Sequence, residues 1–433
     1  MSAVFTVVDE RRRAPPPRWR VQWLFAAPHR MAFACGALMF ALAATWWAAA
    51  SIAQSQGLAW RWGLPSPIAH GLLMGFGFMP MFFAGFLFTA GPKWLGQPPV
   101  AARSIVGALL AQLAGWGVFA IGVHARAPEM AAVYGAFGLA AVTAGWALMV
   151  LRFARLVATS RVPDRVHAAL VAWAGAFGVI ALAASAVGVW RGDYALVRAA
   201  LHAGLWGFIG TVYVSVTHRM IPFFTASALP LLDAWRPLWL LAVFVATMLF
   251  EAAWALADAW WWPQGAALLA LRAAFEAPVA ALLLWLAWRW GLVQSMKIRL
   301  LAMLHVGFFW LGVALALQAA SHALMAASDG QLSLGLAPLH AYTIGFLGST
   351  LVAMATRVAS GHGGRPLAAD DFVWRLFWLL QSAVLLRVAA SLAPEVSRWA
   401  TPLAGIGFAV VALAWAGRYG RWFGTPRADG RPG

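Results

Sequence analysis

The chain has 433 residues, of which 63% are hydrophobic and only 10% are charged, well below the roughly 25% charged residues of a typical soluble domain. This composition excludes a soluble globule and is typical of a protein solvated by lipid. The net charge of +17 comes from basic residues spread over short segments between apolar stretches, so nucleic acid is not an expected partner. The single cysteine, Cys35, excludes an intramolecular disulfide framework, a covalent c-type haem motif and a CxxC redox pair.

Hydrophobic runs of about twenty residues, long enough to cross a hydrocarbon core of about 30 Å, recur along the chain. Helix is the only structure expected for them, because backbone in contact with lipid must satisfy its own hydrogen bonds. We therefore predict an all-α membrane protein with about twelve transmembrane helices. One transmembrane domain, 31–417, is expected between a basic N-terminal tail, 1–30, and a C-terminal tail, 418–433. The predicted spans are 31–54, 68–90, 102–123, 129–151, 166–189, 195–217, 237–257, 263–288, 300–321, 335–356, 372–392 and 399–417.

The distribution of Lys and Arg predicts the orientation of these spans. Of the 31 basic residues, 24 lie in the tails and in the loops between even and odd spans, and five lie in the loops on the other side. Because basic residues are retained on the cytoplasmic side, both termini are expected in the cytoplasm. The polar, Pro-rich N-terminus shows no pattern of a secretory signal peptide.

The second, sixth and tenth predicted spans open with the same pattern, His-x4-Gly-Phe. Chance alone predicts far fewer than one copy at this composition. The spacings of 132 and 138 residues suggest three pseudo-repeats of four helices each. Seventeen residues after the His, the second and third copies have Arg219 and Arg357, whereas the first has Leu87. The three motif histidines are His70, His202 and His340.

These histidines fall at one depth, towards the side expected to be periplasmic. Ionisable residues inside a membrane are costly and commonly functional, although a single His can equally well hydrogen-bond a neighbouring helix. Neutral imidazole suits haem iron, copper and zinc, whereas the scarcity of intramembrane carboxylates and thiolates disfavours hard ions and iron–sulfur clusters. The glycine five residues after each His is expected to serve close helix packing. The candidate metal ligands are His70, His202 and His340, followed by His305, His218 and His362.

Three charged residues inside the predicted spans offer candidates for proton transfer. Glu276 follows Arg272 by four residues in one predicted helix, where a mutual ion pair would lower the cost of burial. This pair could carry protons or simply lock helices together, and locking is the favoured interpretation. Glu251, which has no partner nearby in the sequence, is a second candidate for a proton path.

The loop 357–366 follows the tenth span and is rich in hydrogen-bond donors and in glycine. Its two arginines, Arg357 and Arg365, could hold haem propionates or another anion, because Arg binds carboxylates through two parallel hydrogen bonds. An ordered loop without a ligand is the alternative.

Three segments of the chain resemble signatures of the NnrS family. Residues 70–96, which begin His-Gly-Leu-Leu-Met-Gly-Phe and end Ala-Gly-Pro-Lys-Trp-Leu-Gly, resemble its early signature. Residues 218–225, His-Arg-Met-Ile-Pro-Phe-Phe-Thr, resemble its central motif, and 339–367 resemble its late signature. Gly363 and Lys93 depart from the usual Thr and Asn of the family, and neither departure removes a candidate metal ligand.

The resemblance implies a bacterial inner-membrane protein that contains haem and copper and is associated with denitrification and protection against nitric oxide. The expected cofactors are therefore a non-covalent, b-type haem and copper, and the expected small-molecule partner is nitric oxide. Because a c-type haem motif is absent, electrons are expected from a membrane quinol or a separate donor protein.

The predicted layout is also similar to the catalytic subunit of haem–copper oxidases and nitric oxide reductases, with His near the periplasmic ends of helices 2, 6 and 10. That similarity implies that His70 and His340 face haem iron and that His202 faces copper or a second haem. Two departures weaken it: the seventh span lacks a His pair, and the tenth has one His where those enzymes have two. A dinuclear site of their type is therefore not expected from this likeness alone.

Three hypotheses of function follow. The favoured one is a haem oxidoreductase that consumes nitric oxide, with reduction to nitrous oxide as the expected reaction. The second is a sensor or binding protein that captures nitric oxide without turnover. The third is a membrane transporter, although such folds usually show two-fold repeats and helices broken at mid-membrane.

Overall fold

The computed structural model describes residues 18–431, and this part of the chain forms helices and no strands. Twelve helices or helix groups are long and apolar enough to cross a membrane, which confirms the predicted number and class. We number these spans 1 to 12 in chain order. Spans 1 to 5 are α1 (Pro28–Ser55), α2 with α3 (Ser66–Phe76 and Met79–Trp94), α4 (Val106–Val123) after the short η2 (Ala102–Ile105), α5 (Pro128–Thr159) and α6 (Val166–Arg191).

Span 6 is composite and consists of α7 (Tyr194–Gly204), η3 (Leu205–Gly210) and α8 (Thr211–Ala228). Spans 7 to 9 are α9 (Leu238–Trp260), α10 (Ala266–Arg289) and α12 (Arg299–Ala327), with the short α11 (Leu292–Ser295) before α12. Span 10 is again composite and consists of α13 (Ala337–His340), η4 (Ala341–Gly348) and α14 (Ser349–His362). Spans 11 and 12 are α15 (Asp371–Leu392) and α16 (Pro394–Phe423).

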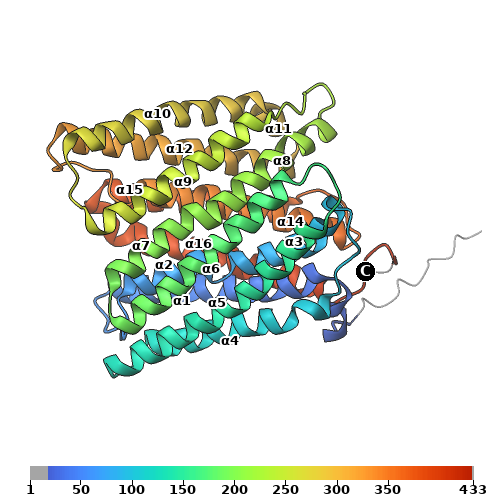
Figure 1. The fold of residues 1–433 in the computed structure, drawn as a ribbon, viewed down its shortest axis with the longest axis horizontal. Coiled ribbons are helices and arrows are strands. Elements are labelled where there is room, and N and C mark those ends of the chain that lie inside the picture. The colour runs from blue at the N-terminus through green and yellow to red at the C-terminus, as the bar shows by residue number, and fades with distance from the viewer. Residues whose placement is uncertain (1–17, 432–433) are drawn as a thin grey trace, which may run out of the picture.

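The spans lie side by side along the long axis of the molecule (Figure 1). We call the end where α1 begins and α16 ends the terminal end. There η1 (Val21–Ala26) packs against α1, and the backbone N–H of Arg20 donates to the carbonyl of Gly424, 2.8 Å away. The helices extend beyond the expected limits of 31 and 417, since α1 begins at Pro28 and α16 ends at Phe423. The rest of the expected tails, 1–17 and 432–433, lies outside the described residues, and cytoplasmic termini remain a prediction.

The three spans that carry the His-x4-Gly-Phe motif form the centre of the bundle. In their most apolar stretches, 83%, 89% and 78% of the residues of spans 2, 6 and 10 are buried, against 39–67% in the other nine spans. The outer spans pack in pairs, such as α4 on α5, α10 on α12 and α1 on α16. In Figure 1, α4 lies at one edge of the bundle and α10 at the opposite edge. The motif therefore marks the helices that are least exposed to lipid.

The motif glycines and phenylalanines serve packing, as expected for the glycines. Each motif Phe is fully buried. A Cβ atom added to a motif glycine would come within 2.8–3.0 Å of a side chain from another span, so any larger residue would require that side chain to shift. The pairs are Gly75 with Leu205, Gly207 with Phe177, and Gly345 with Trp310.

Each motif span also loses regular α-helical geometry shortly after its histidine. Span 2 breaks between Phe76 and Met79, whereas η3 and η4 are π-helical turns that follow His202 and His340. Such widened turns are uncommon and occur frequently at functional sites. The organisation into three four-helix repeats remains a prediction.

Candidate functional site

Near the end of the bundle opposite the terminal end, a cavity of about 210 Å³ lies among spans 1, 2, 6, 10, 11 and 12. A single water needs only about 10–15 Å³ by this measure, so the cavity is large enough for a substantial ligand. The structure brings all three motif histidines to its wall, so we call it the histidine cavity. These residues are His70 of α2, His202 of α7 and His340 of α13.

The ring of His340 is oriented by its own helix. Its Nδ1 lies 2.9 Å from the carbonyl oxygen of Leu336, which makes Nδ1 the donor and leaves Nε2 with a lone pair. A backbone carbonyl behind one ring nitrogen is the usual support of a histidine that ligates a metal through the other. His340 therefore has the arrangement of a metal ligand.

His70, in span 2, also lines the cavity. The indole of Trp47 stacks on its ring at a centroid distance of 3.8 Å, and its Nδ1 is buried without a hydrogen-bond partner among the described residues. A buried ring nitrogen without a partner is rare.

Arg387 of span 11 lines the same cavity, and sequence reasoning missed its importance. Its guanidinium donates to the hydroxyl of Ser391, 2.7 Å away, and forms no ion pair within residues 18–431. An unpaired cation inside a membrane protein is costly unless it binds an anion. One feature of the sequence could have indicated this residue, because Arg272 and Arg387 both lie inside predicted spans.

These residues fit a haem better than a copper ion. Two histidines in the cavity wall, one of them with its Nε2 free to coordinate, together with aromatic side chains and an arginine for a propionate match the needs of a non-covalent haem. No group of three or more His, Cys, Asp or Glu side chains placed to hold one metal ion occurs between residues 18 and 431. The described residues therefore do not assemble a copper site with three such ligands.

The remaining candidate histidines lie towards the terminal end and are engaged in other contacts. His218 faces His167 at 3.0 Å between Nδ1 and Nε2, and its own Nε2 lies 3.2 Å from the carbonyl of Pro237, so both of its ring nitrogens are occupied. His305 meets the hydroxyl of Thr225 at 2.9 Å.

His362 packs against His29, a histidine that the sequence-based candidates did not include. Their ring centroids are 4.6 Å apart, which joins the start of α1 to the end of α14. The two histidines are far apart in the sequence, so no local pattern could have predicted the contact.

Arg357 and Arg365, the expected haem-propionate ligands, lie away from the histidine cavity. Arg357 follows His340 by seventeen residues in span 10, which corresponds to about 25 Å along a helix. Its guanidinium lies 3.7 Å from the ring centre of Phe224, and that of Arg365 lies 4.1 Å from the ring centre of Trp422. Burial, and secondarily the neighbouring Arg418, lower the pKa of Arg365. For a haem in the histidine cavity, Arg387 therefore replaces this pair as the candidate propionate partner.

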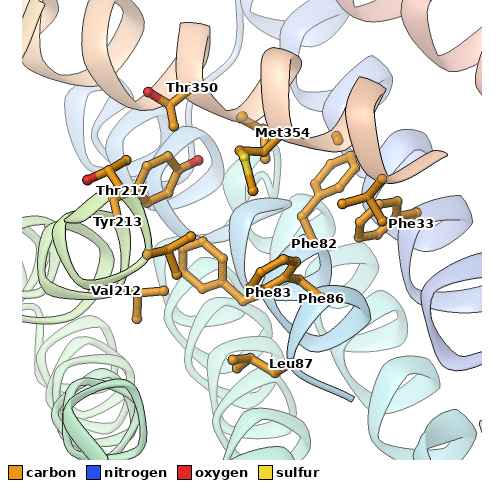
Figure 2. Close-up of a pocket in the computed structure, with 14 residues that line it drawn as sticks. Phe33, Phe82, Phe83, Phe86, Leu87, Val212, Tyr213, Thr217, Thr350 and Met354 are labelled. Atoms are coloured by element: carbon orange, nitrogen blue, oxygen red, sulfur yellow. The ribbon is translucent and has the colours of Figure 1, made fainter. Parts of the chain in front are cut away.

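A second, smaller cavity of about 60 Å³ lies among spans 1, 2, 6 and 10 on the terminal side of the histidine cavity (Figure 2). Phenylalanine rings form much of its wall, and we call it the apolar cavity. The hydroxyls of Tyr213 and Thr350, which lie on one side in Figure 2, are buried without partners among the described residues. Leu351 lines both cavities.

The charged residues of spans 7 to 9 are arranged differently from the prediction. Arg272 pairs with Asp258, with 2.9 Å between Nη1 and Oδ1, and not with Glu276. Glu276 instead binds His322, with 2.8 Å between Oε2 and Nδ1. The expected i,i+4 ion pair is therefore wrong, because partners from neighbouring spans compete successfully for both groups. Glu251 lies beside Glu276 in the interior.

No curated protein was found to match the chain. The family model described as "NnrS protein" matches residues 23–427, which covers all twelve spans. The chain therefore belongs to the NnrS family, which is associated with the nitric oxide response.

Proposed function

We propose that this chain is a haem-containing membrane protein that removes nitric oxide by reducing it to nitrous oxide, with the haem bound in the histidine cavity. One observation carries the proposal: His70, His340 and Arg387, which has no acidic partner among residues 18–431, line one cavity among the spans of a twelve-span bundle. Family membership supports nitric oxide as the substrate. The protein would function in the bacterial inner membrane with both termini in the cytoplasm.

Each residue of the cavity has a distinct task in this proposal. His340 and His70 would ligate the iron, and the carbonyl of Leu336 would fix the ring of His340 for that task. Arg387 would bind a propionate through charge-assisted hydrogen bonds. His202 would line the space in which the substrate reacts.

A bound haem would supply a redox-active iron, at which nitric oxide would take the place of one of the two histidine ligands. In the overall reaction, two nitric oxide molecules, two electrons and two protons give one nitrous oxide and one water. A membrane quinol, oxidised to quinone, or a separate donor protein would supply the electrons. Copper is not included, because the described residues do not provide three such ligands at one point.

The apolar cavity supports a route for the substrate. Nitric oxide is small and nearly apolar, so it dissolves in lipid and in an apolar cavity. Because Leu351 alone lines both cavities, a small displacement of its side chain would connect them. Water and ions would be excluded from this route by its phenylalanine wall.

Gas analysis of the purified protein tests the proposal. Protein given a reductant and nitric oxide without oxygen should release nitrous oxide, with two nitric oxide molecules consumed for each product molecule. His340→Ala should abolish this activity, whereas His305→Ala, a buried histidine outside the cavity, should retain most of it. Stoichiometric binding of nitric oxide without product would instead identify a sensor or binding protein. No binding at all would leave transport as the remaining hypothesis.

A further inference from the structure

A row of aromatic rings joins His70 to the loop between spans 1 and 2, at the end of the bundle opposite the terminal end. We infer that electrons reach the histidine cavity along this row, and that a soluble electron-carrier protein with an acidic face docks where the row meets the surface. The inference rests on the proposed function and identifies the class of its electron donor. From the cavity outwards, the row consists of His70, Trp47, Trp46 and Trp62.

Each ring of the row packs against the next. The ring of His70 stacks on the indole of Trp47, with 3.8 Å between their centroids. The centroids of Trp47 and Trp46 are 5.8 Å apart, and Trp46 meets Trp62 edge to face at 5.7 Å. Packed aromatic pairs have centroids no more than about 7 Å apart, so the row contains no gap. Because electrons tunnel more readily through packed atoms than across gaps, the row couples its outer end to His70.

One histidine holds the outer rings in place. The indole N–H of Trp46 donates to Nε2 of His124, 2.8 Å away. Nδ1 of the same ring then carries the hydrogen and donates to the backbone carbonyl of Arg61, 2.9 Å away. The ring of Trp62 lies 5.8 Å from that of His124. An interfacial tryptophan usually keeps its N–H in the wet headgroup region, so these contacts indicate a fixed position within the protein and not a membrane anchor.

The outer end of the row lies on a positively charged surface. Trp62 is half-buried, and the preceding Arg61 is exposed. The backbone N–H of Gly63 donates to the carbonyl of Val123 over 2.7 Å, which brings this loop beside the segment that carries the exposed Arg126. Neither arginine forms an ion pair among the described residues. A partner with an acidic face would therefore be attracted to this surface, and its encounter with the protein would be faster.

The charge of this surface indicates the class of donor. Glu129, three residues after Arg126, is the nearest acidic residue in the sequence and leaves the arginines in excess. A membrane quinol is uncharged and gains no attraction from them, whereas an acidic carrier protein does. In each encounter the reduced carrier would lose one electron and the ferric iron of the bound haem would become ferrous, while the tryptophans keep their oxidation state. Two such encounters would supply the electrons for one nitrous oxide.

Flash-induced reduction of the haem tests the route without a donor protein. A ruthenium photosensitiser attached to the thiol of Arg61→Cys would inject an electron beside Trp62, and the buried Cys35 would not compete for the label. In this labelled protein, Trp46→Ala should lower the rate of haem reduction severalfold, because it opens a gap in the row. Trp46→Phe loses the same hydrogen bond but keeps a ring, so it should retain most of the rate. The control is Trp190→Ala, which removes an exposed tryptophan at the same end of the bundle and should change nothing.

Reduction by a carrier protein tests the docking surface. Plant-type ferredoxin, a small acidic iron–sulfur protein, is the probe. Without oxygen or nitric oxide, reduced ferredoxin should reduce the haem at a rate that falls as salt is added, because salt screens opposite charges. Arg61→Gln and Arg126→Gln should each lower this rate severalfold, whereas Arg398→Gln, exposed at the same end, should not. Duroquinol, an uncharged quinol, should reduce the haem more slowly and equally in all four proteins.

Three results would overturn the inference. An unchanged flash-induced rate in Trp46→Ala would show that electrons do not follow the row. Faster reduction by duroquinol than by ferredoxin, or a ferredoxin rate that responds neither to salt nor to the two arginines, would show that the donor is not an acidic carrier protein. Haem reduction along the row without nitrous oxide formation would refute the proposed function and leave the route standing, whereas a protein without haem would overturn both.

Discussion

Replacing Arg387 by Gln tests whether this arginine binds a haem propionate or is a buried arginine without a ligand. Arg387 lines the histidine cavity and has no acidic partner within residues 18–431. A charge-assisted hydrogen bond contributes about 1.5–3 kcal/mol, and about 1.4 kcal/mol corresponds to a tenfold change in a dissociation constant. Arg387→Gln should therefore weaken haem binding by about 10-fold to 100-fold. The haem-free variant should unfold at a higher temperature than haem-free wild type, because an unpaired intramembrane charge has been removed.

The assay is a titration of haem-free protein with haem, followed by absorbance, together with thermal unfolding of the haem-free forms. Arg398→Gln is the control, because Arg398 is exposed at the same end of the bundle and does not line the cavity. If Arg387→Gln binds haem as tightly as wild type, the arginine does not contact a propionate, and the placement of haem in this cavity loses its electrostatic support.

Three further changes test other parts of the structure. Leu351→Trp should slow nitric oxide consumption without altering the haem spectrum, because the larger side chain blocks the link between the cavities; stopped-flow mixing with nitric oxide measures this. Gly138→Ala should lower the free energy of unfolding by about 1–3 kcal/mol, since the added Cβ would lie 2.5 Å from the backbone nitrogen of Phe119; denaturant titration would show no change if α4 and α5 can separate freely. Arg418 lowers the pKa of Asp370 through hydrogen bonds, so this carboxylate stabilises the fold above its unfolded pKa of about 4, and the contribution is lost as the pH falls through the lower folded value. Because Asp370 is half exposed, the effect is at most about 0.5 kcal/mol, and Asp370→Asn should remove it in melting curves at pH 7 and below pH 4.

Much of the fold follows from local sequence. Each apolar run forms a helical span, because backbone in lipid must satisfy its own hydrogen bonds. The repeated motif correctly marked the three most buried spans. His70, His202 and His340 were expected at a common depth, and the structure brings all three to one cavity.

The parts that sequence could not supply depend on contacts between distant segments. Arg387 and Trp47 reach the histidine cavity from spans 11 and 1, and no motif connects them to the histidines. Arg272 was expected to pair with Glu276 within its own helix, but Asp258 at the end of the preceding span provides a closer partner. The spacing of residues along one helix identifies only partners on that helix, whereas partners such as Asp258 become available when the helices pack together.

Haem content and iron ligation of the purified protein test the central claim most directly. Wild type should carry haem with two histidine ligands, as read by optical and electron paramagnetic resonance spectra. His70→Ala and His340→Ala should each lose that signature or lose haem, whereas His305→Ala should keep both, since His305 bonds to Thr225 outside the cavity. A wild type without haem, or an unchanged spectrum in both His70→Ala and His340→Ala, would contradict the claim that this cavity holds the haem.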